Sequence, residues 1–211
     1  MDVIEDDCAV VDENWTTPIE EVTKPGGDPT VCQDGQTSCD PSPLVVSLSG
    51  QYTFTSAAEG VLFDIDADGD LDRVAWPAAH GDVAFVALDR NGNGRIDDGS
   101  ELFGDHARLA NGDRARNGFE VLAELDANAD SVVDGKDPAW SELVLWFDRN
   151  HDGISLRAEL WPIADSEVTG LETGYRWIGR RDRHANMFRY ASRIHHLFGR
   201  RPYYDVFLRV E

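Results

Sequence analysis

Four short acidic clusters share one spacing, which constrains the chain more than any other feature. In each cluster oxygen-bearing side chains recur at every second residue, and in three of the four a glycine occupies the sixth place. Ca²⁺ is a hard cation that takes six to eight oxygen ligands. A twelve-residue loop supplies them from positions 1, 3, 5, 7, 9 and 12, with a sharp turn at position 6. The spacing therefore predicts a series of EF-hand-like calcium loops.

The most regular cluster lies at residues 148–159 and is expected to have apolar helices on both sides. Its expected ligands are Asp148, Asn150, Asp152, the main-chain carbonyl of Ile154, and Glu159. Glu at position 12 can bind the ion through both carboxylate oxygens. This cluster is the strongest candidate for a calcium site.

A second candidate lies at residues 126–137, between two segments predicted to be helical. Its expected ligands are Asp126, Asn128, Asp130, the main-chain carbonyl of Val132, Asp134 and Asp137. Position 6 is Ser131 rather than glycine, so we expect strain at the turn. The last acid is Asp, which is shorter than Glu. We therefore predict a weaker, helix–loop–helix site.

Two clusters follow predicted strands. In residues 89–101 the expected ligands are Asp89, Asn91, Asn93, the main-chain carbonyl of Arg95, Asp97 and Glu101, with the last acid one residue later than usual. In residues 64–75 the expected ligands are Asp64, Asp66, Asp68, Asp70 and Asp72, but Ala75 occupies position 12. These five acids repel one another unless a cation lies among them. A solvated acidic turn is the alternative for this cluster.

The apolar pattern outside the clusters predicts an α+β fold, with short strands and β-hairpins around helix–loop–helix and strand–loop calcium sites. Helical segments are expected at 117–125, 138–147 and 157–161. Strands are expected at 44–48, 61–65, 73–76, 83–88, 174–178, 187–194 and 203–210, with 174–178 pairing with 187–194. The arginines of the C-terminal strands are expected to face solvent.

The chain divides into two predicted regions. Residues 1–43 are acidic and rich in proline, as is typical of a leader or linker. Residues 44–211 form the predicted calcium-binding domain, with loops and helices over 44–162 and strands over 163–211. The net charge of −21 argues against a nucleic-acid partner and favours cations. No apolar run is long enough to span a bilayer.

The cysteines and the N-terminus bear on the compartment. Cys32 and Cys39 are close in sequence and flanked by turn residues, which favours a small disulfide loop and an oxidising compartment. Three free thiols are the alternative, with Cys8 included. The first residues lack the basic start and apolar stretch of a signal peptide. The chain is then either cytosolic or a mature segment of an exported protein.

Residues 60–160 resemble a calcium-binding module of secreted bacterial proteins, whose best-known relative is the self-processing module of RTX-type proteins. The motif LDRNGNG…IDDGSELFG carries the resemblance. The resemblance implies a secreted or cell-surface location. Self-processing relatives cut an Asp–Pro bond at the N-terminal edge of the module once calcium binds, and the freed aspartyl group can join a lysine amine. The comparable edge here is Ser42-Pro43, and an Asp–Pro pair, Asp40-Pro41, lies two residues earlier.

Three functions follow as hypotheses. The leading one is a secreted calcium-binding module whose folding depends on the metal. The second is a calcium-triggered self-cleaving module, with Asp40 and Pro41 as the candidate catalytic residues. The third, an intracellular calcium sensor, requires a Met-rich groove, and the chain has only 2 Met. The sequence indicates no specific protein partner.

Overall fold

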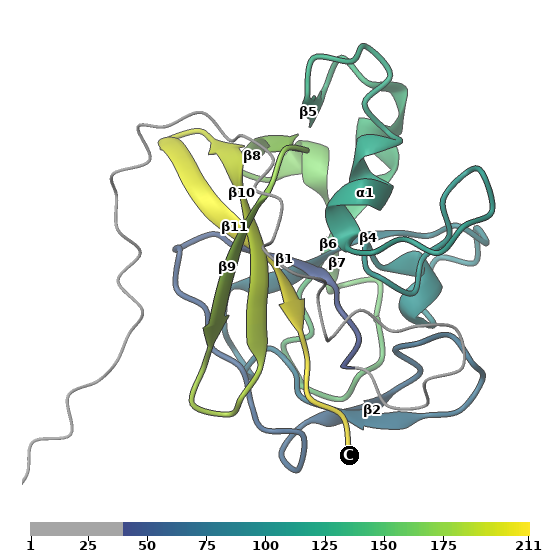
Figure 1. Cartoon of the computed structure of the whole chain (residues 1–211), viewed down its shortest axis with the longest axis vertical. Helices are drawn as coiled ribbons and strands as arrows, with labels where there is room; N and C mark the ends of the chain where they lie inside the picture. The colour runs from purple at the N-terminus through teal and green to yellow at the C-terminus, as the bar shows by residue number, and fades with distance from the viewer. Residues whose placement is uncertain (1–39) are drawn as a thin grey trace, which may run out of the picture.

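The computed structural model describes residues 40–211, and Figure 1 shows a curled sheet with long loops around it, whose strands pair antiparallel. The strands of the large sheet are β1 Leu44–Ser47, β4 Val83–Leu88, β5 Val132–Asp134, β6 Leu143–Trp146, β7 Leu160–Pro162, β8 Val168–Glu172, β9 Arg176–Arg181, β10 Met187–His196 and β11 Gly199–Phe207. A separate hairpin joins β2 Val61–Phe63 to β3 Asp72–Val74. The expected linker, residues 1–43, lies almost wholly outside the described residues. The expected Cys32–Cys39 disulfide lies wholly outside them.

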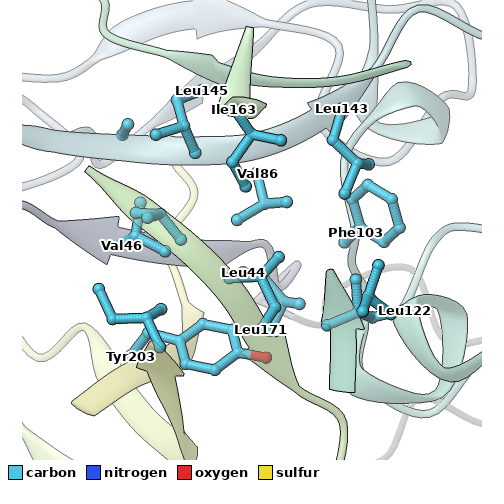
Figure 2. Close-up of a cluster of buried hydrophobic side chains, with 14 of the residues drawn as sticks. Leu44, Val46, Val86, Phe103, Leu122, Leu143, Leu145, Ile163, Leu171 and Tyr203 are labelled. Carbon is cyan, nitrogen blue, oxygen red and sulfur yellow. The ribbon is translucent and has the colours of Figure 1, made fainter. Parts of the chain in front are cut away.

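The large sheet has the strand order β5-β8-β10-β11-β1-β4-β6-β7, and β9 pairs with β10. Both of its faces are covered, since neighbouring residues of one strand enter different cores. Val46 and Val86 belong to one apolar cluster, whereas Val45 and Phe85 belong to the other. Figure 2 shows the first cluster, in which side chains of β1 and β4 meet Leu122 of the helix. Burial on both faces explains why β4 is a continuous apolar run.

Little of the described chain is helical. The only α-helix among residues 40–211 is α1, Gly118–Ala123, and the 3-10 helices are η1 Gly99–Glu101, η2 Pro138–Glu142 and η3 Ile163–Asp165. Asn117 caps α1, because its side chain accepts the N–H groups of Phe119 and Glu120. No described helix combines the length and the apolar character needed to cross a bilayer.

The predicted α+β class is wrong, because the described chain is nearly all β. The predicted helix at 138–147 is a short 3-10 turn followed by β6, which pairs with β4 in the centre of the sheet. The predicted helical turn at 157–161 runs into β7. Residues 40–211 therefore contain no helix–loop–helix unit. Each acidic cluster instead joins two strands, or a strand and a helix.

Most strand predictions are confirmed. β4 has the predicted bounds, and β9 pairs with β10 as expected. Tyr204, Val206 and Leu208, which alternate along the predicted strand 203–210, lie in one apolar cluster. The prediction of solvent-facing arginines fails at Arg189, which is buried with its guanidinium over the ring of Phe207.

Candidate metal centre

The acidic clusters form four loops that share one pattern of hydrogen bonds. In chain order, loop 1 is 64–75, loop 2 is 89–101, loop 3 is 126–137 and loop 4 is 148–159. In each loop the carboxylate at position 1 accepts the N–H groups of positions 5 and 6. The side chain at position 5 accepts the N–H of position 7. The main chain therefore turns around these oxygens in the same way four times.

This turn uses left-handed backbone at two places in each loop. At position 4 the residues are Ala67, Gly92, Ala129 and His151, with φ from 58° to 72°. At position 6 they are Gly69, Gly94, Ser131 and Gly153, with φ from 67° to 97°. Glycine adopts this conformation freely and other residues adopt it at a cost. Ser131 adopts it at 67°, in line with the strain expected at this position.

The last acid of loops 2, 3 and 4 closes the loop. These acids are Glu101, Asp137 and Glu159, and all three are buried. Each accepts the N–H groups of positions 2 and 9 at 2.8 to 3.2 Å. Glu101 makes this pair of bonds although it lies one residue later in its loop. Loop 1 has no such acid, because Ala75 holds that place.

Loop 1 brings three carboxylates together. One oxygen from each of Asp64, Asp66 and Asp68 lies within 4.8 Å of the others, the arrangement of a candidate metal site. Burial raises the pKa of Asp64 and of Asp72, and repulsion from neighbouring carboxylates raises both further. Asp70 of the same loop is exposed. The cluster is therefore disfavoured as a set of bare charges, and a bound cation would relieve the repulsion.

Loops 2 and 3 hold cationic or amide donors against their acids. In loop 2 the side-chain amides of Asn91 and Asn93 donate to Asp97. In loop 3 the ammonium of Lys136 lies 3.2 Å from Asp130 and 2.9 Å from Asp134. The hydrogen bond from Lys136 lowers the pKa of Asp134. Lys136 is a group that the sequence analysis missed, and it would compete with a metal ion for two of the predicted ligands.

Loop 4 is anchored by residues far away in sequence. The indole N–H of Trp76 donates to Asp148 at 2.8 Å, and both side chains are buried. The two ring nitrogens of His151 lie 3.1 Å from the carbonyl of Pro77 and 3.0 Å from that of Glu59. No spacing in the sequence signals these contacts, since Trp76 and Asp148 are 72 residues apart.

Loops 1, 2 and 4 are joined to one another, whereas loop 3 extends into β5 and pairs with β8. The hydroxyl of Ser155, at position 8 of loop 4, bonds the N–H and the carbonyl of Ile96, at position 8 of loop 2. The N–H of Gly99 donates to the carbonyl of Asp64 at 2.8 Å. A Cβ at Gly99 would lie 1.8 Å from the carbonyl oxygen of Ile65, so only glycine permits this approach of loops 1 and 2.

The other candidate residues lie as follows. The position-7 residues Arg95, Val132 and Ile154 donate their N–H groups to position 5 of their own loops. Asn128 and Asn150 accept the N–H of position 5 in loops 3 and 4. Asp40 precedes the loops in sequence and forms an ion pair with Arg209, whose Nη1 lies 3.0 Å from one carboxylate oxygen and 2.7 Å from the other. Pro41, which follows it, is buried.

Comparison with known proteins identifies the family of this chain and a bacterial relative. The SPM domain family matches residues 44–208, and the chain belongs to this family. The chain is also 38% identical over 141 residues to the iron-regulated protein FrpA of Neisseria meningitidis serogroup C. That match covers 65% of this chain and 12% of the relative. The predicted relationship to RTX-type proteins is confirmed.

Proposed function

We propose that this chain is a calcium-binding module. Loops 2, 3 and 4 would each hold one ion through the ligands predicted from their sequence, and loop 1 would hold a fourth. The observation that carries the proposal is the fourfold repeat of the same hydrogen bonds, together with the buried closing acid of three loops. Side-chain oxygens of Asp, Asn and Glu, with main-chain carbonyls, are the donors that Ca²⁺ prefers.

We also propose that calcium is structural and that the module works outside the cell. Extracellular calcium modules bind with dissociation constants of about 10⁻⁴ to 10⁻³ M, and loops strained by a non-glycine turn or by a competing ammonium suit this range. Adjacent carboxylates repel one another until a cation lies between them. Export is supported by the relationship to FrpA and by the family resemblance.

Calorimetric titration of the full chain with CaCl₂ tests the proposal. We expect three or four sites, and fewer than two would contradict it. Glu159→Gln should remove or weaken one site about tenfold or more, because it deletes a charge at the bidentate position. Glu142→Gln, an exposed acid of η2 outside the loops, is the matched control and should leave the titration unchanged.

A second candidate function is calcium-dependent cleavage of the Asp40–Pro41 bond. Membership of the SPM domain family supports it, and so does the fixed place of the bond. The carbonyl of Pro41 accepts the N–H of Leu208 at 2.9 Å, which fixes the C-terminal side of the bond, whereas the Asp40 carboxylate is paired with Arg209 and must leave this ion pair to react. In the proposed step the carboxylate attacks its own main-chain carbonyl carbon. A cyclic anhydride forms, the bond to the prolyl nitrogen breaks, and that nitrogen takes a proton; water then opens the anhydride.

Mass spectrometry after incubation with calcium at neutral pH tests the cleavage. A new chain beginning at Pro41 is expected, and it should be absent from Asp40→Ala. Arg209→Ala should cleave faster, because the carboxylate must leave its ion pair before it can attack. Intact protein in all three samples would exclude the reaction and leave the calcium-binding function untouched.

A further inference from the structure

The segment before β1 is clamped between two parts of the fold. On one side the N–H groups of Val206 and Leu208 donate to the carbonyls of Pro43 and Pro41 at 3.1 and 2.9 Å. On the other side the N–H of Leu44 donates to the carbonyl of Phe103 at 2.7 Å. We call residues 41–44 the clamped segment. Its side chains are buried throughout.

Ser42 occupies the centre of this segment and is only 4% exposed. Its N–H donates to the Asp105 carboxylate at 2.9 Å, and the N–H of Asp105 donates back to the Ser42 hydroxyl at 3.2 Å. A Cβ at Gly104 would lie 1.7 Å from the carbonyl oxygen of Ser42, so the two chains are in direct contact. His106 lies 2.9 Å from the same Asp105 carboxylate.

A fully buried carboxyl lies beneath the segment. Asp205 of β11 is 0% exposed and lies opposite Leu44 in the sheet. Its Oδ2 accepts the N–H of Gly118, at the start of α1, at 2.7 Å. Its Oδ1 is buried and has no hydrogen-bond partner among residues 40–211. No role in the calcium loops or in the Asp40–Pro41 reaction accounts for this group.

The surroundings of Asp205 favour its neutral form. Burial is the largest effect and raises the pKa of Asp205 to about 7, and the charge of Asp105 raises it further. The Gly118 N–H, the Ser42 hydroxyl and the cationic Arg189 of β10 act in the opposite direction. Tyr203, two residues earlier on β11, is itself buried, and the Asp205 charge contributes to raising the pKa of Tyr203.

We propose that Asp205 is a proton-operated latch for residues 41–44. When the carboxyl is neutral, the segment covers it at little cost. When it ionises, the buried charge lies beside Asp105 and its Oδ1 has no hydrogen-bond donor among residues 40–211, and water can reach it only if the segment opens. The latch therefore controls the exposure of the stretch that follows Asp40, whether or not the Asp40–Pro41 bond is cleaved.

The sign of the pH dependence follows from linkage. In the open state Asp205 is hydrated and has the ordinary pKa of about 4, whereas in the closed state its pKa is about 7. Opening therefore releases a proton between these values. The opening equilibrium should rise about tenfold per pH unit from about pH 4 to about pH 7, and it should level off at higher pH.

Hydrogen exchange of the full chain in saturating calcium tests the latch. After correction for intrinsic exchange rates, the protection factors of the Ser42 and Leu44 amides should fall about tenfold per unit up to about pH 7 and then stay constant. Asp205→Asn mimics the neutral carboxyl and should give protection independent of pH. Asp165→Asn, at an exposed aspartate of η3, should behave as the wild type.

The carboxyl of Asp205 can also be titrated directly by NMR in the wild-type chain, which avoids any folding defect of a variant. A midpoint near 7 is expected. An acidic midpoint, in the range of exposed aspartates, would overturn the proposal. It would also be overturned if Asp205 titrates near 7 while Ser42 and Leu44 keep the same protection, or if wild type and Asp205→Asn show the same pH dependence.

Discussion

A substitution at Ser131 can separate the effect of backbone strain on stability from the effect of the calcium ligands. It is exposed and has a φ of 67°, where the other three loops have glycine. Its N–H donates to the Asp126 carboxylate and its carbonyl accepts from the N–H of Thr173, and both bonds use main-chain groups of Ser131. We predict that Ser131→Gly raises the free energy of unfolding by about 0.5 to 1 kcal/mol, because it relieves left-handed strain and keeps these bonds. Urea unfolding in calcium measures the change.

The reverse substitution in loop 4 provides the comparison. Gly153 has a φ of 72°, and a Cβ there would lie 2.8 Å from the carbonyl oxygen of Leu62. Gly153→Ala should therefore destabilise the chain by more than Ser131→Gly stabilises it, since it adds a steric clash to the strain. Equal and opposite effects would show that strain alone matters. A loss of stability in Ser131→Gly would contradict the prediction.

At the same scale, the sequence predicts the register of each loop but not its anchors. Spacing alone assigns Asp148 to position 1 and Glu159 to position 12, because the constraint is local and repeats every second residue. The indole of Trp76, which donates to Asp148, arrives through the pairing of β2 with β3 and the packing of that hairpin on loop 4. Such a contact depends on tertiary structure, so no pattern in one chain reveals it.

At the scale of elements, the strands with clear alternation and the apolar run of β4 were predictable, whereas the apolar run of β6 was not. Trp140, Leu143, Val144 and Phe147 have helical spacing, yet residues 143–146 form β6. A strand buried on both faces has no alternation, so its apolar run fits a helix and a strand equally well. Pairing of β6 with β4 on one side and β7 on the other decides the structure.

A bulge limits the prediction in β10. The register of β10 shifts between Phe188 and Tyr190 in its pairing with β9 and with β11. Phe188 consequently packs on one apolar cluster, while Tyr190 and Ile194 pack on the other, although simple alternation places all three on one side. An inserted residue reverses the faces of everything beyond it. The same bulge explains why Arg189 is buried although it was predicted to face solvent.

At the scale of the whole molecule, the acidic loops and the sheet depend on each other. Loops 1, 2 and 4 are bonded to one another, and each begins at the end of a strand whose side chains fill the core. Repulsion in one loop therefore acts on the others and on the strands that carry them. Loop 3 acts on the opposite end of the sheet through β5 and β8. We expect unfolding to be cooperative across all four loops.

This coupling predicts a large effect of calcium on stability. The chain has a net charge of −21, and each bound ion removes two negative charges from its most acidic parts. A ligand at about 100 times its dissociation constant adds about 2.7 kcal/mol per independent site, so two or three sites approach the whole stability of an ordinary domain. Melting curves in EDTA and in calcium at about 100 times the dissociation constant, roughly 10 to 100 mM for the proposed affinities, should differ by at least ten degrees, the shift expected from several kcal/mol in a domain of this size. Magnesium at the same concentration is the control for simple screening of charge, and it should shift the curve much less, because a loop built for six to eight oxygens fits its octahedral shell poorly. Superimposable curves in EDTA and calcium would refute a structural role for the metal, whatever the number of sites that calorimetry finds.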